Sequence, residues 1–354
     1  MTSSATPAAG LFPGSARAPR LLVSLPALDE ERTVGDVVSR VPRAIPGVGE
    51  IHVLVIDDGS SDRTAERAAA AGAQVIRHPT PRGVGAAFHT ALAHGIDHGA
   101  DLIVSIDADG QFDPADIPKL VAPVLRGEAE LATASRFADP RLTPEMPWVK
   151  RWGNRMMSRL ISSLVGQTFH DVSCGMRCYS RRAALELHLV GRFTYTQEVV
   201  LNLAFKQLRI VEVPIRVRGE REFGASRVAG SLWRYAWRSA RIIFRAYRDY
   251  HPLRFFGGMA LALLAPAVGL GGFLLWHYLS AGSFTPHKWA GFTALGLVLL
   301  ALGLIHIGVI GDMLTRHRIY LEELLYRQRS EGKAKPRSEA QPSDAGARRA
   351  GERD

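Results

Sequence analysis

Hydrophobic residues in the first two thirds of the chain gather in short runs, separated by longer stretches with mixed polarity. The apolar runs predict strands at residues 21–25, 51–56, 74–77, 102–106, 131–135 and 210–215. The stretches between them predict helices at residues 29–41, 63–71, 83–98, 117–126, 148–165 and 197–205. Strands rich in Val, Ile and Leu that alternate with helices are typical of a parallel sheet covered on both faces. The pattern therefore predicts an α/β domain over residues 21–227, in which residues 171–182 form a loop.

The last third of the chain has a different pattern. Residues 255–287 contain no Asp, Glu, Lys or Arg, and neither do residues 289–311. Each stretch supplies the roughly 20 apolar residues that cross a hydrocarbon core of about 30 Å. Two buried core helices are the alternative, but charge-free stretches of this length favour spans. We expect a transmembrane hairpin over residues 253–313, with spans at about 255–279 and 289–311.

A basic amphipathic helix is predicted directly before the first span, over residues 228–252. Its arginines recur every three or four residues and so fall on one stripe: Arg234, Arg238, Arg241, Arg245 and Arg248. Apolar and aromatic residues, from Leu232 to Tyr250, fall on the opposite stripe. This pattern favours a helix that lies in the membrane interface. The alternative is a helix that packs on the soluble domain and exposes its basic face to water.

The formal net charge is +10, and the distribution of the basic residues along the chain favours binding to lipid over binding to nucleic acid. Residues 206–254 hold twelve Lys or Arg and four Asp or Glu, beside the first span, where anionic headgroups attract basic residues. The turn between the spans carries only Lys288. The positive-inside rule therefore predicts a multi-pass protein of the cell membrane, with its α/β domain and both termini in the cytoplasm.

The remaining segments are predicted from composition. Residues 1–20 read as a disordered leader, and residues 314–354 as a cytoplasmic tail with a disordered end and a short amphipathic helix at 320–326. Two cysteines, Cys174 and Cys178, are too few for a disulfide framework and fit a reduced compartment.

Asp107 and Asp109 stand just past the predicted strand 102–106. In an extended chain, residues i and i+2 point to the same side, so both carboxylates are expected to aim at one point. That point lies at the carboxyl edge of the sheet, where open α/β sheets bind ligands. Two carboxylates without a nearby His or Cys suit Mg²⁺ or Mn²⁺ held together with substrate phosphates. An acidic turn without a metal is the alternative.

Eight motifs in order carry a resemblance to a known family. They are Pro-Ala-Leu-Asp-Glu at 26–30, Ile-Asp-Asp-Gly-Ser-Ser-Asp-Arg-Thr at 56–64, Arg-Gly-Val-Gly-Ala-Ala at 82–87, Asp-Ala-Asp-Gly-Gln at 107–111, Ser-Arg-Phe at 135–137, Asp-Val-Ser-Cys-Gly-Met-Arg at 171–177, Val-Glu-Val-Pro at 211–214 and Arg-Glu-Phe-Gly-Ala-Ser-Arg at 221–227. Over about residues 21–228 the chain resembles the family 2 glycosyltransferases, and more narrowly the polyprenyl-phosphate sugar synthases of the dolichol-phosphate mannose synthase group. The resemblance implies a GT-A-like (Rossmann-like) domain, and the two-span tail matches one branch of the group.

The resemblance also implies roles for single residues on the donor side. The positions that match the nucleoside site are Pro26, Leu28, Glu30 and Asp58. The positions that match the metal and diphosphate site, for Mg²⁺ or Mn²⁺, are Asp107, Ala108, Asp109 and Gln111. Arg221 and Arg227 match a basic loop that closes on the phosphates, where the family often has Lys in place of Arg227.

On the acceptor side, Arg136 matches a contact to the lipid phosphate. Arg151, Arg155 and Ser158 on the following helix are weaker candidates for the same contact. Asp171 and Glu198 are candidates for hydrogen bonds to sugar hydroxyls, although Glu198 equally fits an exposed helix position. Arg177 and Cys174 are expected to be structural.

The function implied is inverting transfer of one sugar from a nucleotide-sugar, of the GDP-mannose or UDP-glucose type, to polyprenyl phosphate on the cytoplasmic leaflet. Asp107, Asp109, Arg136, Arg221 and Arg227 are the expected catalytic residues. The expected partners are the donor, the lipid acceptor and anionic lipid, with no nucleic acid, and association into a homo-oligomer stays open. The alternatives are a processive polysaccharide synthase, whose Gln-x-x-Arg-Trp signature is absent, and a non-catalytic membrane scaffold that binds nucleotide-sugar or lipid.

Overall fold

The computed structural model describes residues 17–187, 195–218, 237, 240, 241, 244, 245 and 247–331. Arg221, Arg227, most of the predicted basic helix, most of the predicted leader and the end of the tail lie outside these residues. The predictions made for them stay predictions.

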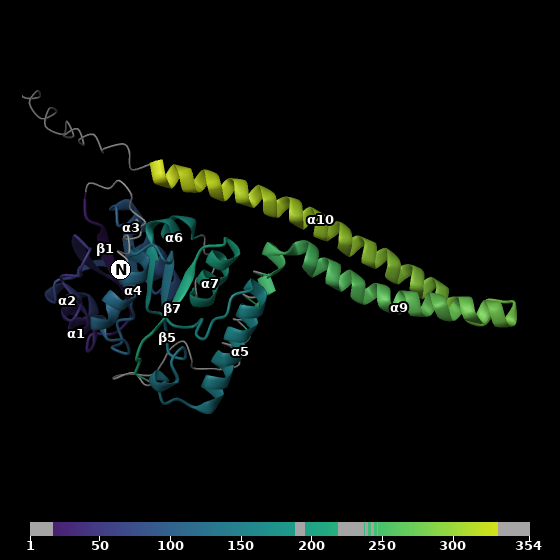
Figure 1. Cartoon of the computed structure of the whole chain (residues 1–354), viewed down its shortest axis with the longest axis horizontal. Coiled ribbons are helices and arrows are strands. Elements are labelled where there is room, and N and C mark those ends of the chain that lie inside the picture. The colour runs from purple at the N-terminus through teal and green to yellow at the C-terminus, as the bar shows by residue number, and fades with distance from the viewer. Residues whose placement is uncertain are drawn as a thin grey trace, which may run out of the picture.

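A seven-stranded mixed sheet forms the centre of the part of the chain that the structure describes (Figure 1). Its strands are β1 (Arg20–Ala27), β2 (Glu50–Asp57), β3 (Gln74–Arg77), β4 (Leu102–Ser105), β5 (Leu131–Ser135), β6 (Arg177–Ser180) and β7 (Ile210–Pro214). Their order is β3-β2-β1-β4-β6-β5-β7, and only β6 runs antiparallel to its neighbours. The sheet is therefore mostly parallel, as predicted.

Helices cover both faces of the sheet. They are α1 (Val34–Ser39), α2 (Thr64–Ala70), α3 (Val84–Asp97), α4 (Ile117–Leu125), α5 (Trp148–Val165), α6 (Arg181–Glu186) and α7 (Thr196–Phe205), with short 3-10 turns η1 (Pro114–Asp116) and η2 (Pro140–Leu142). One core cluster joins the sheet to α1, α2 and α4, through residues such as Val37, Ala68 and Leu120. A second cluster joins the other face to α3, α6 and α7, through residues such as Phe88 and Val199. These two cores confirm the predicted layers.

Segment 171–182 is not the loop that the sequence predicts. Arg177–Ser180 forms β6, a fully buried strand between β4 and β5, and α6 follows at once. A four-residue strand that begins with arginine has no apolar pattern to reveal it. The buried Arg177 guanidinium donates to the carbonyl oxygens of Thr196 and Val172, at 2.7 and 3.1 Å. Its structural role is therefore confirmed.

The first helix is shorter than predicted, because α1 begins at Val34 and not at residue 29. Asp29 has a φ of +48°, which a helix cannot contain. Its backbone N–H donates to Ser60 Oγ at 2.9 Å, and its carboxylate accepts from the Ser61 N–H at 2.7 Å. Residues after β1 thus form a loop that is tied to the loop after β2.

Two long helices, α9 (Pro252–Ala281) and α10 (Lys288–Glu331), pack together and project from the domain (Figure 1). Both are long and apolar enough to cross a membrane, and most of each apolar stretch is exposed, so they are not core helices. The short helix predicted at residues 320–326 is not a separate element, because α10 continues as one helix to Glu331. Its far end returns to the domain, where Glu322 contacts Lys206 at 2.9 Å.

Candidate active site

The carboxyl ends of β1, β2, β4 and β5 meet at one edge of the sheet. The register places Ala27 of β1 beside Asp57 of β2, and Ser24 of β1 beside Ser105 of β4. Pro26 lies near the end of β1, the loops after β1, β2 and β4 carry Leu28, Glu30, Asp58, Asp107, Ala108, Asp109 and Gln111, and Arg136 follows β5. Because parallel strands end on the same side, the topology brings these loops to the edge where α/β sheets bind ligands.

The two aspartates after β4 do not lie on an extended chain, as the sequence argument assumed. The strand ends at Ser105, and Ala108 and Asp109 form a turn that Gly110 completes with a φ of +73°. Asp109 is buried, and its Oδ1 accepts from the Gln111 N–H at 3.1 Å. An Asp side chain that bonds its own backbone two residues on is a common device in turns. Both residues still follow the carboxyl end of β4.

Gly175 lies against the carboxylate of Asp107. The antiparallel pairing of β4 with β6 ends at Ser105 and Arg177, and residues 107 and 175 each lie two positions beyond this pair. A Cβ at Gly175 would stand only 2.7 Å from Asp107 Oδ2 and 3.2 Å from Asp107 Oδ1. The missed strand β6 therefore shapes the site, because a side chain at residue 175 would displace the Asp107 carboxylate.

Tyr195 is a buried core residue beside the end of β4 that the sequence did not single out. Its ring stacks on Phe88 with centroids 4.3 Å apart, and its hydroxyl lies 3.2 Å from Ser105 Oγ. Burial, and to a smaller extent the nearby charge of Asp107, raises the pKa of the Tyr195 hydroxyl. Tyr195 is thus a neutral hydroxyl at the end of β4. No sequence pattern pointed to it, since it precedes α7 and is far from β4 along the chain.

Asp58, predicted to contact the nucleoside, has its carboxylate engaged inside the protein. His78 Nδ1 lies 2.6 Å from Oδ1, and the N–H groups of Arg82 and Gly83 donate to Oδ1 and Oδ2 at 3.0 and 2.7 Å. These contacts fix the turn that leads into α3. Pro26, Leu28 and Glu30 lie at the end of β1 and in the loop that follows it, and the Glu30 N–H donates to Thr64 Oγ1 at 2.8 Å.

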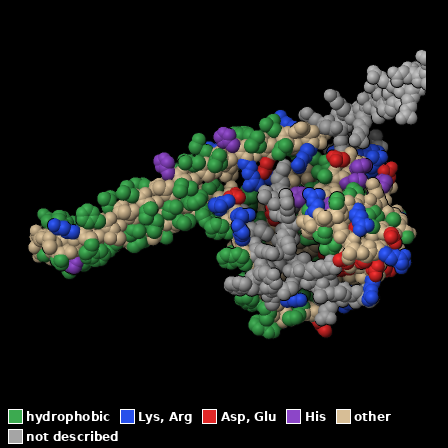
Figure 2. All heavy atoms as spheres, turned by 180° about the vertical axis from the view of Figure 1, so that it is seen from behind, with side chains coloured by type: hydrophobic (Ala, Val, Ile, Leu, Met, Phe, Trp, Pro, Cys, Tyr) green, Lys and Arg blue, Asp and Glu red, His purple; other side chains and the backbone are tan. Residues whose placement is uncertain are grey.

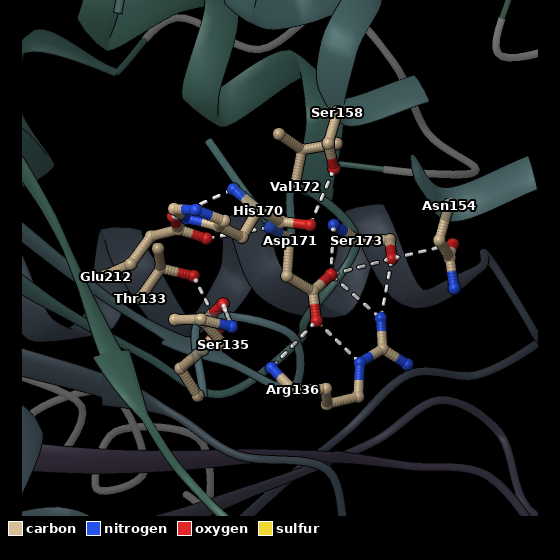
Figure 3. Close-up of polar contacts among 12 residues, drawn as sticks. Thr133, Ser135, Arg136, Asn154, Ser158, His170, Asp171, Val172, Ser173 and Glu212 are labelled. Carbon is tan, nitrogen blue, oxygen red and sulfur yellow. Dashed lines mark hydrogen bonds and ion pairs between the residues drawn. The ribbon is translucent and has the colours of Figure 1, made fainter. Parts of the chain in front are cut away.

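Arg136 and Asp171 form a buried bidentate ion pair (Figure 3). Arg136 Nε donates to Asp171 Oδ2 at 2.6 Å, and Nη2 donates to Oδ1 at 2.9 Å. The Arg136 Nη2 also donates to Ser173 Oγ at 2.7 Å. Burial alone would raise the pKa of Asp171, but the charge and hydrogen bonds of Arg136 outweigh burial and hold this pKa below its usual value.

A second carboxylate fixes the loop that carries Asp171. Glu212 on β7 accepts from the backbone N–H groups of His170 and Asp171, at 2.8 and 2.7 Å. Asp171 is fully buried and orients the Arg136 guanidinium from the protein interior. The Arg136 side chain itself remains 19% exposed at the sheet edge. The structure thus joins two residues that the sequence assigned to different ligands, the acceptor phosphate and the sugar.

The other acceptor candidates are spread out. Arg151 and Arg155 are exposed on α5, whereas Ser158 is buried and its hydroxyl donates to the His170 carbonyl at 3.0 Å. Glu198 lies in the first turn of α7, one helical turn from Asn202, which contacts Tyr250.

The donor atoms at the edge fit a hard divalent cation. The three side chains that the prediction named, Asp107, Asp109 and Gln111, would each bind a metal ion through an oxygen atom. Within the described residues, no group of three His, Cys, Asp or Glu side chains could hold a metal ion. Magnesium sites commonly use one or two carboxylates and take further ligands from substrate phosphates and water.

Comparisons with known proteins decide the family. The model of glycosyl transferase family 2 matches residues 23–187. An uncharacterized glycosyltransferase of Mycobacterium tuberculosis is 36% identical over 211 residues, which cover 59% of this chain and 90% of that protein. The chain belongs to glycosyltransferase family 2. The present chain is also 30% identical, over 227 residues, to the polyprenol monophosphomannose synthase of Mycolicibacterium smegmatis. The match covers 61% of this chain and 84% of the relative.

Solved structures confirm the GT-A-like fold of the glycosyltransferase. Glucosyl-3-phosphoglycerate synthase from Mycobacterium tuberculosis, in complex with Mg²⁺ and uridine diphosphate, superposes with a TM-score of 0.51 at 25% identity, covering 64% of this chain and 79% of that one. The same enzyme in complex with Mn²⁺, uridine diphosphate and glucosyl-3-phosphoglycerate gives a TM-score of 0.52 at 24% identity, covering 64% and 80%.

Proposed function

We propose that this glycosyltransferase transfers one sugar from a nucleotide-sugar to polyprenyl phosphate at the cytoplasmic face of a membrane. The observation that carries the proposal is the combination, in one chain, of a family 2 domain with two exposed apolar helices of membrane-crossing length. The similarity to a polyprenol monophosphomannose synthase supports the lipid acceptor, and the uridine diphosphate of the fold neighbours supports a nucleotide donor.

On the donor side, the loops after β1 and β2 would hold the nucleoside, and Asp107, Asp109 and Gln111 would hold Mg²⁺ or Mn²⁺ with the diphosphate. When bound, the divalent cation supplies neutralisation of the charge that develops on the departing diphosphate. The Asp109 carboxylate is fixed by the Gln111 N–H, and Gly175, which has no Cβ, leaves the Asp107 carboxylate the space that it occupies. Arg221 and Arg227 would add positive charge from their loop.

On the acceptor side, a lipid phosphate monoester has a second pKa near 6 and is mostly a dianion at neutral pH. It therefore needs cations to position it rather than a base to activate it. Arg136 suits this role, because Asp171 holds its guanidinium in one orientation and its side chain remains 19% exposed. A single displacement at the anomeric carbon would invert its configuration.

A panel of nucleotide-sugars tests the proposal. The purified full chain in nanodiscs is given labelled GDP-mannose, UDP-glucose or other donors, with Mn²⁺ and both polyprenyl phosphate and 3-phosphoglycerate, and extraction into organic solvent separates the lipid product from water-soluble products. We expect one donor to give a lipid-linked sugar, and the Asp109→Asn variant to give none while it keeps its fold. A water-soluble product with 3-phosphoglycerate, in place of any lipid product, would contradict the lipid acceptor.

A further inference from the structure

Helix α10 carries a stripe of exposed apolar residues beyond the predicted span. Leu314, Leu321 and Leu324 are 64%, 61% and 62% exposed. Together with His317 and Gln328, which are also exposed, they recur at alternating intervals of three and four residues. This is the heptad spacing of a helix that packs along its length against another helix. At 100° per residue the five side chains fall within an arc of about 80°; we call this stripe the α10 seam.

The rest of the described chain packs on a different side of α10. Gly311 lies against α9, since a Cβ there would stand 2.8 Å from Pro252 Cβ. Further along the helix, Glu322 pairs with Lys206 of the domain at 2.9 Å. These contact positions lie roughly 110° round the helix from the α10 seam. Within the described residues, one copy of the chain therefore leaves the seam uncovered.

The α10 seam continues into the predicted span with the same spacing. Its earlier members are exposed as well: Leu300, Gly303, Ile307 and Ile310. A Cβ at Gly303 would meet no atom within 4 Å, whereas a Cβ at Gly308, which faces α9, would stand 3.3 Å from Phe256 Cβ. Helices in membranes approach one another closely at small residues, so Gly303 suits contact with a second helix. Figure 2 shows hydrophobic side chains along the arm of α9 and α10 up to the domain.

Lipid does not reach the outer half of the seam in a bilayer that the hairpin crosses. The charge-free stretch of α10 ends at Gly311. Leu321 therefore lies about 15 Å beyond this end, and Leu324 about 20 Å beyond it. The headgroup layer on one side of the hydrocarbon core is only about 5–8 Å thick. Residues 332–354 contain no Val, Ile, Leu, Met or aromatic side chain that could cover the leucines.

A second copy of the chain fits this surface. Because every copy would insert in the same direction, two α10 helices are parallel and stand at the same height, so identical seam residues meet. From residue 300 to residue 328 the seam is about 42 Å long on a helix about 10 Å wide, or on the order of 400 Å² per copy. A standard interface buries about 800 Å² per partner. The seam therefore suits copies that one membrane already holds at a high effective concentration.

We propose that the α10 seam joins two copies of this chain, whose α10 helices pack side by side from the span to residue 328. The inference rests on the membrane insertion of the hairpin that the proposed function contains, and it goes beyond that function. His317 and Gln328 would each face their counterparts, and such polar seam residues fix the register of parallel helices. Since Glu322 ties α10 to the domain, the pairing would hold two catalytic domains in a fixed relation on one membrane face.

The test crosslinks single cysteines in the full chain. Both native cysteines are buried, so an introduced thiol is the one that reacts. Leu321→Cys lies on the seam, and Glu323→Cys, exposed about 200° round the helix from it, is the matched control at nearly the same height. Leu302→Cys, exposed within the predicted span, reports insertion. Each variant is placed in nanodiscs in large excess over protein, so that only associated copies share a disc, and is treated with a short bismaleimide or with a water-soluble maleimide.

We expect the thiol at 321 to form covalent dimers on the order of tenfold more than the thiol at 323, because the seam holds two thiols at a high effective concentration. Equal crosslinking at 321 and 323 would show random collision and refute the inference. Without a crosslink, a thiol at 321 that the water-soluble maleimide reaches would show a solvated face, and one that it does not reach would show a face covered by another segment of the same chain. Either result refutes the seam and leaves the lipid-linked sugar assay of the proposed function unaffected.

A second measurement needs no crosslinker. Leu321→Glu with Leu324→Glu places charges on the seam, at side chains that are exposed in a single copy. We expect this double variant to unfold at the same temperature as the unmodified chain and to lower the particle mass to that of one copy per disc, with Glu323→Gln as the unchanged control. A mass that the double variant does not lower would overturn the inference. Reaction of Leu302→Cys with the water-soluble maleimide would refute hairpin insertion, and the membrane-held seam with it.

Discussion

Substitution of Gly175 by alanine tests whether the Asp107 carboxylate belongs to the reacting centre. The new Cβ would stand 2.7 Å from Asp107 Oδ2, whereas ordinary contact begins at 3.4 Å. The carboxylate must therefore move by about 0.7 Å, several times the roughly 0.2 Å within which metal–ligand distances vary. The clash involves the carboxylate of Asp107, whose side chain is short and therefore has few ways to move away from the new Cβ.

We expect Gly175→Ala to weaken the apparent affinity for Mn²⁺ by about 10- to 100-fold, the usual effect of disturbing the groups that orient a metal ligand. The assay is a Mn²⁺ titration of sugar transfer at saturating donor, with thermal unfolding as a check on the fold. Gly35→Ala in α1 is the matched control, because its Cβ would meet only the Arg67 carbonyl at 3.7 Å. An unchanged Mn²⁺ titration in a folded Gly175→Ala variant would refute the placement of Asp107 at the metal.

Three further outcomes are expected. Chelation with EDTA should abolish transfer and added Mn²⁺ or Mg²⁺ should restore it; turnover that survives dialysis against EDTA would contradict a metal-dependent site. Asp171→Asn leaves the guanidinium of Arg136 without its buried counter-ion and should cost about 3–5 kcal/mol of stability, measured by denaturant unfolding. Because the pKa of Asp171 is lowered in the folded protein, its contribution is present at neutral pH and is lost as the pH falls through that value, so the acid sensitivity of unfolding should weaken in the variant. Glu322→Gln removes the carboxylate shared by Lys206 and Arg318 and should cost about 2 kcal/mol, seen as faster proteolysis of the end of α10; an unchanged rate would show that the contact is not stabilising.

The parallel part of the sheet was predictable because its strands are short runs of Val, Ile and Leu, and β3 and β5 have the bounds that the pattern gave. β6 escaped, since a strand that begins with Arg177 depends on carbonyl partners from distant segments. Local pattern cannot reveal such partners. The turn at Asp109 was missed for a different reason: its signal, Gly110, is local, but the argument extended the strand geometry past residue 106.

The predicted site divides in a similar way. Asp107 and Asp109 could be singled out because a carboxylate pair after a buried strand is a local signal, and their role at a metal stays a prediction. The pairing of Arg136 with Asp171 joins residues 35 positions apart, and the contact between Tyr195 and Ser105 joins residues 90 apart. Such pairs follow from the order of the strands, which the sequence did not provide. The roles of Arg221 and Arg227 stay predictions.

Because α10 is one continuous helix, it couples the position of the domain to the position of the apolar hairpin. A helix rises 1.5 Å per residue, so the 44 residues of α10 extend about 66 Å, roughly twice the thickness of the hydrocarbon core. The second half of α10 lies along the domain, where Arg318 donates to the Tyr250 hydroxyl at 2.8 Å and Tyr326 packs on the second core cluster. Insertion of one residue after Gly311 would rotate everything beyond it by about 100° and part these contacts. In a bilayer crossed by the hairpin, the distance and the orientation of the sheet edge relative to the lipid surface therefore depend on the rotation of α10 about its own axis.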